Sequence, residues 1–155
     1  MVPAHDELLN WVERVSMYLA AEGVPPMAGR ILGWLMVCDP PEQSAGEICE
    51  AIGASRASLT TNMRVLTTMG FVVRRSRPGQ RTAYYRVDHN AWERVVQRQI
   101  DGMTAFRDIT RDGLTMFGTR NARADRIREA QDVFDWMAKA FDNAQPPHST
   151  SKKKP

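Results

Sequence analysis

The spacing of apolar residues predicts a helix near the start of the chain. Between Ala4 and about Ala21 the apolar positions recur in steps of four, three and four, which places them on one helix face. These positions are Leu8, Val12, Val15 and Leu19. A glycine and two prolines then end the helix. The next segment, MAGRILGWLMVC, is apolar on nearly all sides, which predicts a central buried helix that a neighbour can approach closely at Gly29 and Gly33.

The middle of the chain has the pattern of two short helices joined by a tight turn. Ser44-Ala45-Gly46-Glu47 has the form of a capping box, in which a serine and a glutamate three residues later satisfy backbone N–H groups. It predicts a short helix that ends at Gly53. Ser55 is placed to cap a second helix, which runs to about Met69 and ends at Gly70.

After Gly70 the pattern changes to strands. FVVRRS and TAYYRV are rich in β-branched and aromatic residues, and RPGQR between them contains a Pro-Gly turn signal. This pattern predicts a β-hairpin whose tip is lined with arginines.

Two further helices are predicted beyond the hairpin. A long helix begins at Asn90, and the segment from Gly118 to Asn121 interrupts its pattern. The last helix has apolar residues in steps of three, four, three and four, the spacing of a heptad seam. They are Ile127, Ala130, Phe134, Met137 and Phe141. The tail QPPHSTSKKKP lacks apolar residues and is predicted to be disordered.

Positive charge is concentrated between Ser55 and Val87. This segment carries seven arginines and no Asp, Glu or Lys. Its charge of +7 exceeds the net charge of +3 for the whole chain, so the remaining residues sum to −4. A local basic patch indicates an anionic partner more specifically than a high overall pI does.

Two short helices and a hairpin together predict a winged helix-turn-helix, a mostly α fold with a small β-hairpin wing. In this unit the second helix enters the DNA major groove and the hairpin reaches along the backbone toward the minor groove. If Leu59, Met63 and Leu66 face the core, the opposite face presents short polar side chains and arginines to base edges and phosphates. The predicted DNA-binding residues are Ser55, Arg56, Ala57, Ser58, Thr60, Thr61 and Arg64 on the helix, with Arg74, Arg75, Arg77, Gln80 and Arg81 on the wing.

Arg86 lies on the outgoing strand of the hairpin, and two roles are compatible with its position. It either contacts DNA or holds the wing to the body of the domain. The sequence leaves both open.

The order of these elements resembles the MarR family of bacterial winged-helix regulators over residues 5 to 142. The run GRILGWLMVCDP is the most specific part of the resemblance. The longer segment GRILGWLMVCDPPEQSAGEICEAIGASRASLTTNMRVLTTMGFVVRR is similar to a subgroup common in actinobacteria, whose members often repress efflux or membrane-transport genes. Many relatives carry an acidic residue in the wing turn just before the arginine that corresponds to Arg81. Here the turn is PGQR, so that carboxylate is absent.

The resemblance implies a homodimer in which the N- and C-terminal helices interlock. The heptad-like stripes of both end helices support a dimer independently, because two end helices beside a compact lobe have few other partners. The alternative is that they pack on the core of their own subunit. The predicted dimerisation residues are Leu8, Val12, Val15, Leu19, Ile127, Phe134, Met137 and Phe141. A dimer would read a pseudo-palindromic operator.

The resemblance also implies repression that is relieved by a small apolar or aromatic effector bound between the dimer helices and the DNA-binding lobe. Trp34, Met103 and Phe106 are the residues predicted to line that pocket. At helical spacing the same residue types also form ordinary core.

Two further readings concern other kinds of function. Cys38 and Cys49 would make a thiol-based redox sensor if they were reactive, although both lie in apolar surroundings that favour inert thiols. A protein-interaction module built on a winged helix is the other alternative. Such modules have an uncharged recognition helix and wing, whereas both are rich in arginine here.

The sequence predicts neither an enzyme nor a cofactor or metal protein. It has no Gly-rich phosphate loop and no nucleophile elbow. His5, His89 and His148 are scattered, without the spacing of a metal site.

The patterns predict four segments and a cytoplasmic location. These segments are an N-terminal dimerisation helix (1–24), a DNA-binding domain (25–88), C-terminal dimerisation helices (89–143) and a basic tail (144–155). The start of the chain lacks the apolar region of a signal peptide, and no apolar run approaches the ~20 residues of a membrane span.

Overall fold

The computed structural model describes residues 2–118 and 121–144 and divides the chain into two compact units. Unit 1 comprises Met1–Ala91 and unit 2 comprises Trp92–Pro155. The predicted basic tail lies outside the described residues except for its first residue, Ala144. None of the helices in the described ranges is both long and apolar enough to cross a membrane.

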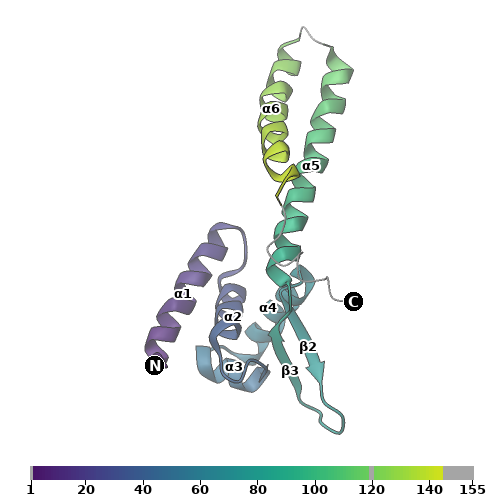
Figure 1. Ribbon diagram of the computed structural model, residues 1–155. Coiled ribbons are helices and arrows are strands. Elements are labelled where there is room, and N and C mark those ends of the chain that lie inside the picture. The colour runs from purple at the N-terminus through teal and green to yellow at the C-terminus, as the bar shows by residue number, and fades with distance from the viewer. Residues whose placement is uncertain (1, 119–120, 145–155) are drawn as a thin grey trace. The chain divides into compact units, whose positions relative to one another are not determined.

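Unit 1 is a winged helix-turn-helix with one additional helix at its start (Figure 1). In chain order it contains α1 (His5–Ala21), α2 (Pro26–Val37), β1 (Gln43–Ser44), α3 (Ala45–Ile52), α4 (Arg56–Met69), β2 (Val72–Ser76) and β3 (Ala83–Val87). The strands form an antiparallel sheet in the order β1-β3-β2. The predicted fold class is therefore confirmed, and β1 is an element that the sequence pattern did not indicate.

Helix α2 is the centre of unit 1 and packs against α1, α3, α4 and β3. Ile31 and Leu32 of α2 are fully buried, as are Leu59 and Leu66 of α4. This confirms the predicted inward face of α4. The predicted buried helix is also confirmed, since seven of the twelve residues of α2 are buried.

Glycines allow α1 and α2 to pack closely. A Cβ added to Gly29 would lie 2.8 Å from the Cα of Ser16, and one added to Gly33 would lie 3.3 Å from the Cα of Val12. The hydroxyl of Ser16 donates a 2.7 Å hydrogen bond to the carbonyl oxygen of Pro26 and so satisfies the polar atom that this packing buries.

The apolar stripe of α1 packs inside the chain. Val12 is 1% exposed and Leu19 is 5% exposed within a single subunit, whereas Leu8 and Val15 are half-buried. The side chains of Val12 and Leu19 therefore belong to the core of unit 1, which is the alternative that the sequence left open. A subunit contact made by α1 would have to use its other face, where Met17 and Tyr18 are exposed.

Unit 2 is a pair of helices that lie side by side (Figure 1). They are α5 (Ala91–Phe117), whose first residue still belongs to unit 1, and α6 (Ala122–Asp142). Phe106 meets Phe134 edge to face with ring centroids 4.7 Å apart, and Thr110 donates a hydrogen bond to the side-chain oxygen of Gln131. The predicted seam of α6, Ile127, Phe134, Met137 and Phe141, is half-buried.

Candidate nucleic-acid interface

Local capping residues determine where the two helices of the helix-turn-helix begin and end. The Ser44 hydroxyl accepts a hydrogen bond from the backbone N–H of Glu47, and the Glu47 carboxylate accepts one from the backbone N–H of Ser44. The backbone N–H of Ser44, followed by its hydroxyl, donates a hydrogen bond to this carboxylate, and the two bonds hold the pKa of Glu47 below its ordinary value of 4.5. Gly53 ends α3 in the left-handed conformation, and Gly70 ends α4 in the same way. The predicted capping box and both terminators are confirmed.

The N-terminus of α4 offers free backbone donors. Ser55 caps this helix by accepting a hydrogen bond from the backbone N–H of Ser58. Among the described residues, the N–H groups of Arg56 and Ala57 have no partner, because they precede the first intrahelical bond. The first turn contains no acidic residue. A phosphate group could therefore accept hydrogen bonds here, at the positive end of the helix dipole.

The outward face of α4 is exposed where the sequence predicts contacts with DNA. Arg56, Ala57, Thr60, Thr61 and Arg64 are exposed, and Ser58 is half-buried. The threonine hydroxyls donate to backbone carbonyls one turn earlier, Thr60 to Arg56 and Thr61 to Ala57. Both side chains are exposed, so their methyl groups can meet thymine methyl groups and their oxygens can accept hydrogen bonds from base donors.

Arg56 lies differently from Arg64. Its guanidinium approaches the backbone of Gly46 in α3, where an added Cβ would lie 2.9 Å from Nη2 of Arg56. The absence of a side chain at Gly46 makes room for this arginine beside the start of α3. Arg64 makes no hydrogen bond or ion pair with another described side chain, so its guanidinium is available to a ligand.

The wing is a regular hairpin with an exposed, basic tip. Arg75 pairs with Tyr84 and Ser76 with Ala83 in the register of β2 and β3. Gly79 has a φ of +74° in the turn, a conformation that favours glycine. All five predicted wing residues, Arg74, Arg75, Arg77, Gln80 and Arg81, are exposed.

Glu42 makes two ion pairs with arginines of the wing that the sequence did not reveal. Glu42 lies 3.5 Å from Nη2 of Arg77 and 3.7 Å from Nε of Arg86. Arg86 is only 29% exposed, so of its two readings the structure favours the one in which it holds the wing to the domain. Glu42 has no sequence signal of its own, because it precedes a strand of only two residues.

The residues predicted to line an effector pocket are not all in one unit. Trp34 lies in unit 1, where its indole N–H donates a 2.7 Å hydrogen bond to the buried side chain of Gln43. This contact is typical of a satisfied core residue. Met103 and Phe106 lie in unit 2, so a pocket that combines all three residues stays a prediction.

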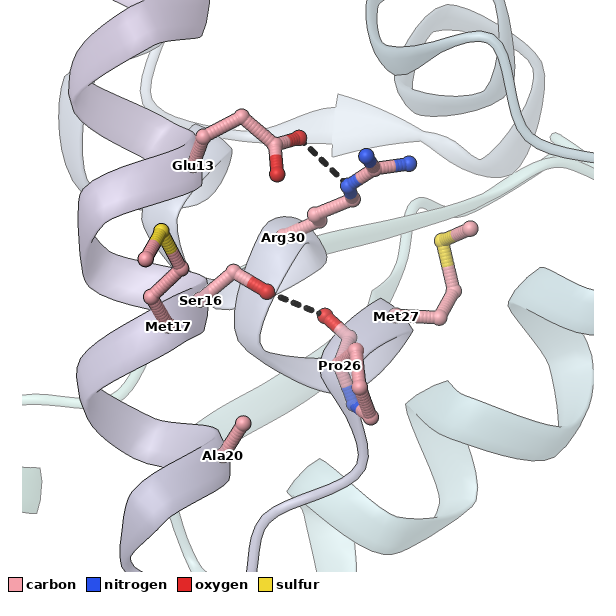
Figure 2. Close-up of a pocket in the computed structure, with 7 residues that line it drawn as sticks. All are labelled: Glu13, Ser16, Met17, Ala20, Pro26, Met27 and Arg30. Atoms are coloured by element: carbon pink, nitrogen blue, oxygen red, sulfur yellow. Dashed lines mark hydrogen bonds and ion pairs between the residues drawn. The ribbon is translucent and has the colours of Figure 1, made fainter.

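Each unit has an open groove of its own. The groove of unit 1, about 430 Å³ in volume, lies between α1 and α2, with Met17 and Met27 on its walls and an ion pair between Glu13 and Arg30 at 2.5 Å (Figure 2). The groove of unit 2 lies between α5 and α6 and includes Phe106 but not Met103.

The two cysteines are free thiols. Cys38 is buried, and this burial raises the pKa of its thiol to about 11. The reactive thiolate form of Cys38 is therefore rare at neutral pH, which argues against this residue as a redox sensor. Cys49 is half-buried on α3. Within the described ranges, no group of three or more His, Cys, Asp or Glu residues could hold a metal ion.

The chain is similar to known regulators along most of its length. Residues 22–81 match the model of the MarR family, and residues 90–144 match that of the MmpR5-like MarR family transcriptional regulators. The HTH-type transcriptional regulator MmpR5 of Mycobacterium tuberculosis (strain ATCC 25618 / H37Rv) is 33% identical over 142 residues, which cover 91% of this chain and 86% of that protein.

A solved structure described as the crystal structure of a transcriptional regulator has the same fold. It superposes with a TM-score of 0.69 at 33% identity and covers 88% of this chain and 94% of its own. Identity at this level over nearly the whole chain establishes the family. The chain belongs to the MarR family of winged helix-turn-helix transcriptional regulators, which are DNA-binding proteins and not enzymes.

Proposed function

We propose that this chain is a cytoplasmic, homodimeric repressor of efflux or transport genes that binds a pseudo-palindromic operator. The observation that carries the proposal is the exposed face of α4, which presents Thr60, Thr61 and Arg64 and contains no acidic residue. In this reading α4 contacts base edges in the major groove, and the wing contacts the phosphate backbone or minor groove. The role as a repressor of efflux genes rests on the resemblance to the actinobacterial subgroup.

The surface of unit 2 supports the homodimer. Trp92, Val96, Ile109, Met116, Val133 and Trp136 are all exposed in the single chain, with 79% of Met116 and 68% of Trp136 accessible. Exposed apolar side chains at this density mark an interaction surface. In a two-fold dimer they would meet the same surface of a second copy, and two α4 helices ~34 Å apart would reach successive major grooves.

A small apolar or aromatic effector would regulate the dimer by changing the distance between its two α4 helices. Simultaneous contact with two half-sites requires one distance, so an effector that favours another distance releases the operator. A coupling free energy of ~1–3 kcal/mol suffices for a useful switch. Titration of apolar compounds against the operator complex tests this part of the proposal, and it fails if none changes DNA affinity or tryptophan fluorescence.

Fluorescence anisotropy with DNA from immediately upstream of the chain's own gene tests DNA recognition. A scrambled duplex serves as the reference, and each titration is repeated at several salt concentrations. We expect tight, sequence-dependent binding with a steep salt dependence, because several phosphates are neutralised in each subunit. Equal and weak binding to both duplexes would contradict recognition of this site, and absence of binding at low salt would favour the protein-interaction alternative.

Single arginine substitutions separate base contacts from phosphate contacts. Arg64→Ala should weaken operator binding by ~1–3 kcal/mol and reduce the preference for the operator, whereas Arg77→Ala should weaken binding to all sequences similarly. Arg14→Ala, which removes an exposed arginine from α1, is the matched control and should leave both affinities unchanged. If Arg64→Ala behaves like the control, α4 does not face the bases as proposed.

A further inference from the structure

Glu42 is an acidic residue at the base of a basic wing. It immediately precedes β1, in which Gln43 pairs with Tyr85 and Ser44 with Tyr84. One step further along this antiparallel register, Glu42 comes opposite Arg86. The ion pair of 3.7 Å between its carboxylate and Nε of Arg86 is thus a cross-strand pair, which the pairing of β1 with β3 holds in place.

The same carboxylate also reaches Arg77, the residue that follows β2. Its second oxygen lies 3.5 Å from Nη2 of Arg77, and the guanidinium of Arg77 lies over the ring of Tyr84 at 4.0 Å from the centroid. Arg77 is therefore held by the acid that precedes β1 and by an aromatic ring from β3. Half of its side chain remains exposed and can meet a ligand.

Arg86 explains why a carboxylate is needed at this position. Its Nε is buried and has no hydrogen-bond partner among the described residues. A buried guanidinium nitrogen is costly unless an opposite charge compensates it, and Glu42 supplies that charge. Glu42 forms ion pairs with Arg77 and Arg86. The exposed wing arginines Arg75 and Arg81 form none with any described residue.

We propose that Glu42 is a positioning residue of the DNA interface. By pairing with Arg86 and Arg77 it ties the wing to the strand that leads into α3, and it holds the guanidinium of Arg77 where it meets the phosphate backbone. The carboxylate of Glu42 by itself repels phosphate. Glu42 therefore favours DNA binding only because it holds Arg77 and Arg86 in place. The proposal rests on the proposed role of the wing in DNA binding.

Glu42→Gln tests the proposal because it removes the charge and keeps the shape. Exposed ion pairs contribute modestly, so we expect operator affinity to fall roughly five- to tenfold for a dimer that loses the pairs in both subunits. Glu13→Gln is the matched control. It removes the same charge from an ion pair with Arg30 in the same unit and should not weaken binding. In an Arg77→Ala background, Glu42→Gln should have a clearly smaller effect, because the two residues act together.

Amide hydrogen exchange supplies a measurement that does not depend on DNA. Glu42→Gln should accelerate exchange in β1 and β3 and leave α2 protected. Tighter DNA binding by Glu42→Gln with a steeper salt dependence would overturn the proposal, since Glu42 would then compete with phosphate for Arg77. Effects equal to those of Glu13→Gln would overturn it as well.

Failure of the proposed function has a different signature. If Arg64→Ala and Arg77→Ala both leave DNA affinity unchanged, the assigned DNA surface is wrong. If instead both arginine variants weaken DNA binding, while Glu42→Gln accelerates exchange in β1 and β3 and leaves DNA affinity unchanged, only the positioning role of Glu42 is overturned.

Discussion

Unit 1 encloses a core of large apolar side chains, whereas the large apolar side chains described in unit 2 are all half-buried or exposed. Phe71, Ile31, Leu32, Ile48, Leu59 and Leu66 are almost completely buried in unit 1. The buried apolar residues of the described part of unit 2 are two alanines, Ala124 and Ala138, while tryptophan, methionine and isoleucine side chains lie on its surface. Two helices side by side cannot enclose a core, because each has only one neighbour to cover its apolar face.

This difference indicates that the two units depend on assembly to different degrees. Unit 1 has the core of an independently folded domain, with its polar groups satisfied by caps and by pairs such as Trp34 and Gln43. Unit 2 exposes several large apolar side chains, which is typical of a surface that contacts another protein subunit. In the proposed dimer, unit 1 would contact DNA with residues of one chain, and unit 2 would set the distance between the two copies of unit 1.

The largest effect is expected from a cavity in the core of unit 1. Leu66→Ala should lower the free energy of unfolding by about 2–5 kcal/mol, because Leu66 is fully buried in the interior face of α4. Chemical denaturation monitored by circular dichroism measures this loss. The change should not depend on protein concentration. A loss below about 1 kcal/mol would mean that the core of unit 1 is looser than its burial indicates.

The next effect concerns the exposed surface of unit 2. Trp136→Ala should weaken self-association by about 2 kcal/mol or more if this indole lies centrally in the dimer interface, since exposed tryptophans are frequent interface anchors. Sedimentation equilibrium measures the change, and thermal unfolding of the variant should become more dependent on concentration. Unchanged association would remove Trp136 from the interface and with it the proposed role of this face.

Alanine substitutions at two glycines should change stability by smaller amounts and in opposite directions. Gly29→Ala should destabilise unit 1 by about 1–3 kcal/mol, because the new methyl group would meet the backbone of Ser16 at 2.8 Å. Gly102→Ala should stabilise α5 by about 0.5–1 kcal/mol, since nothing lies within 4 Å of the added carbon. Thermal unfolding of both variants tests the contrast. Destabilisation by Gly102→Ala would show that a subunit contact covers this position.

The smallest effect is a pH dependence at the start of α3. The capping hydrogen bonds lower the pKa of Glu47 in the folded protein, so its ionised form stabilises the fold at and above its ordinary pKa of 4.5. That contribution is lost as pH falls through the lowered pKa. Glu47→Gln should therefore be slightly less stable than the unchanged chain at pH 7 and equally stable near pH 2. A difference in stability that persists at pH 2 would assign the effect to packing.

Much of the candidate site could be predicted because its signals are local. Ser44, Glu47, Ser55, Gly53 and Gly70 act on backbone groups within four residues, so their types and spacing were enough to locate α3 and α4. The helical periodicity of α4 is also a local signal, and it correctly placed Leu59 and Met63 on the buried face and Thr60 and Arg64 on the exposed face. The turn at Pro78-Gly79 identified the wing.

The remaining features depend on contacts between distant segments. Strand β1 has two residues and therefore no period to detect, and only its pairing with Tyr84 and Tyr85 brings Glu42 to the wing. The stripe of α1 was predicted to contact a second subunit, but the close approach of α2 at Gly29 places Val12 and Leu19 in the core of their own chain.

The sequence by itself determined the elements, their caps, the basic α4–wing surface and the family resemblance, because each of these follows from neighbouring residues. Tertiary structure decided which acid pairs with Arg77 and Arg86 and which apolar faces remain exposed. These outcomes depend on which surfaces come together in space, since a stripe or a charge is compatible with several partners until packing selects one.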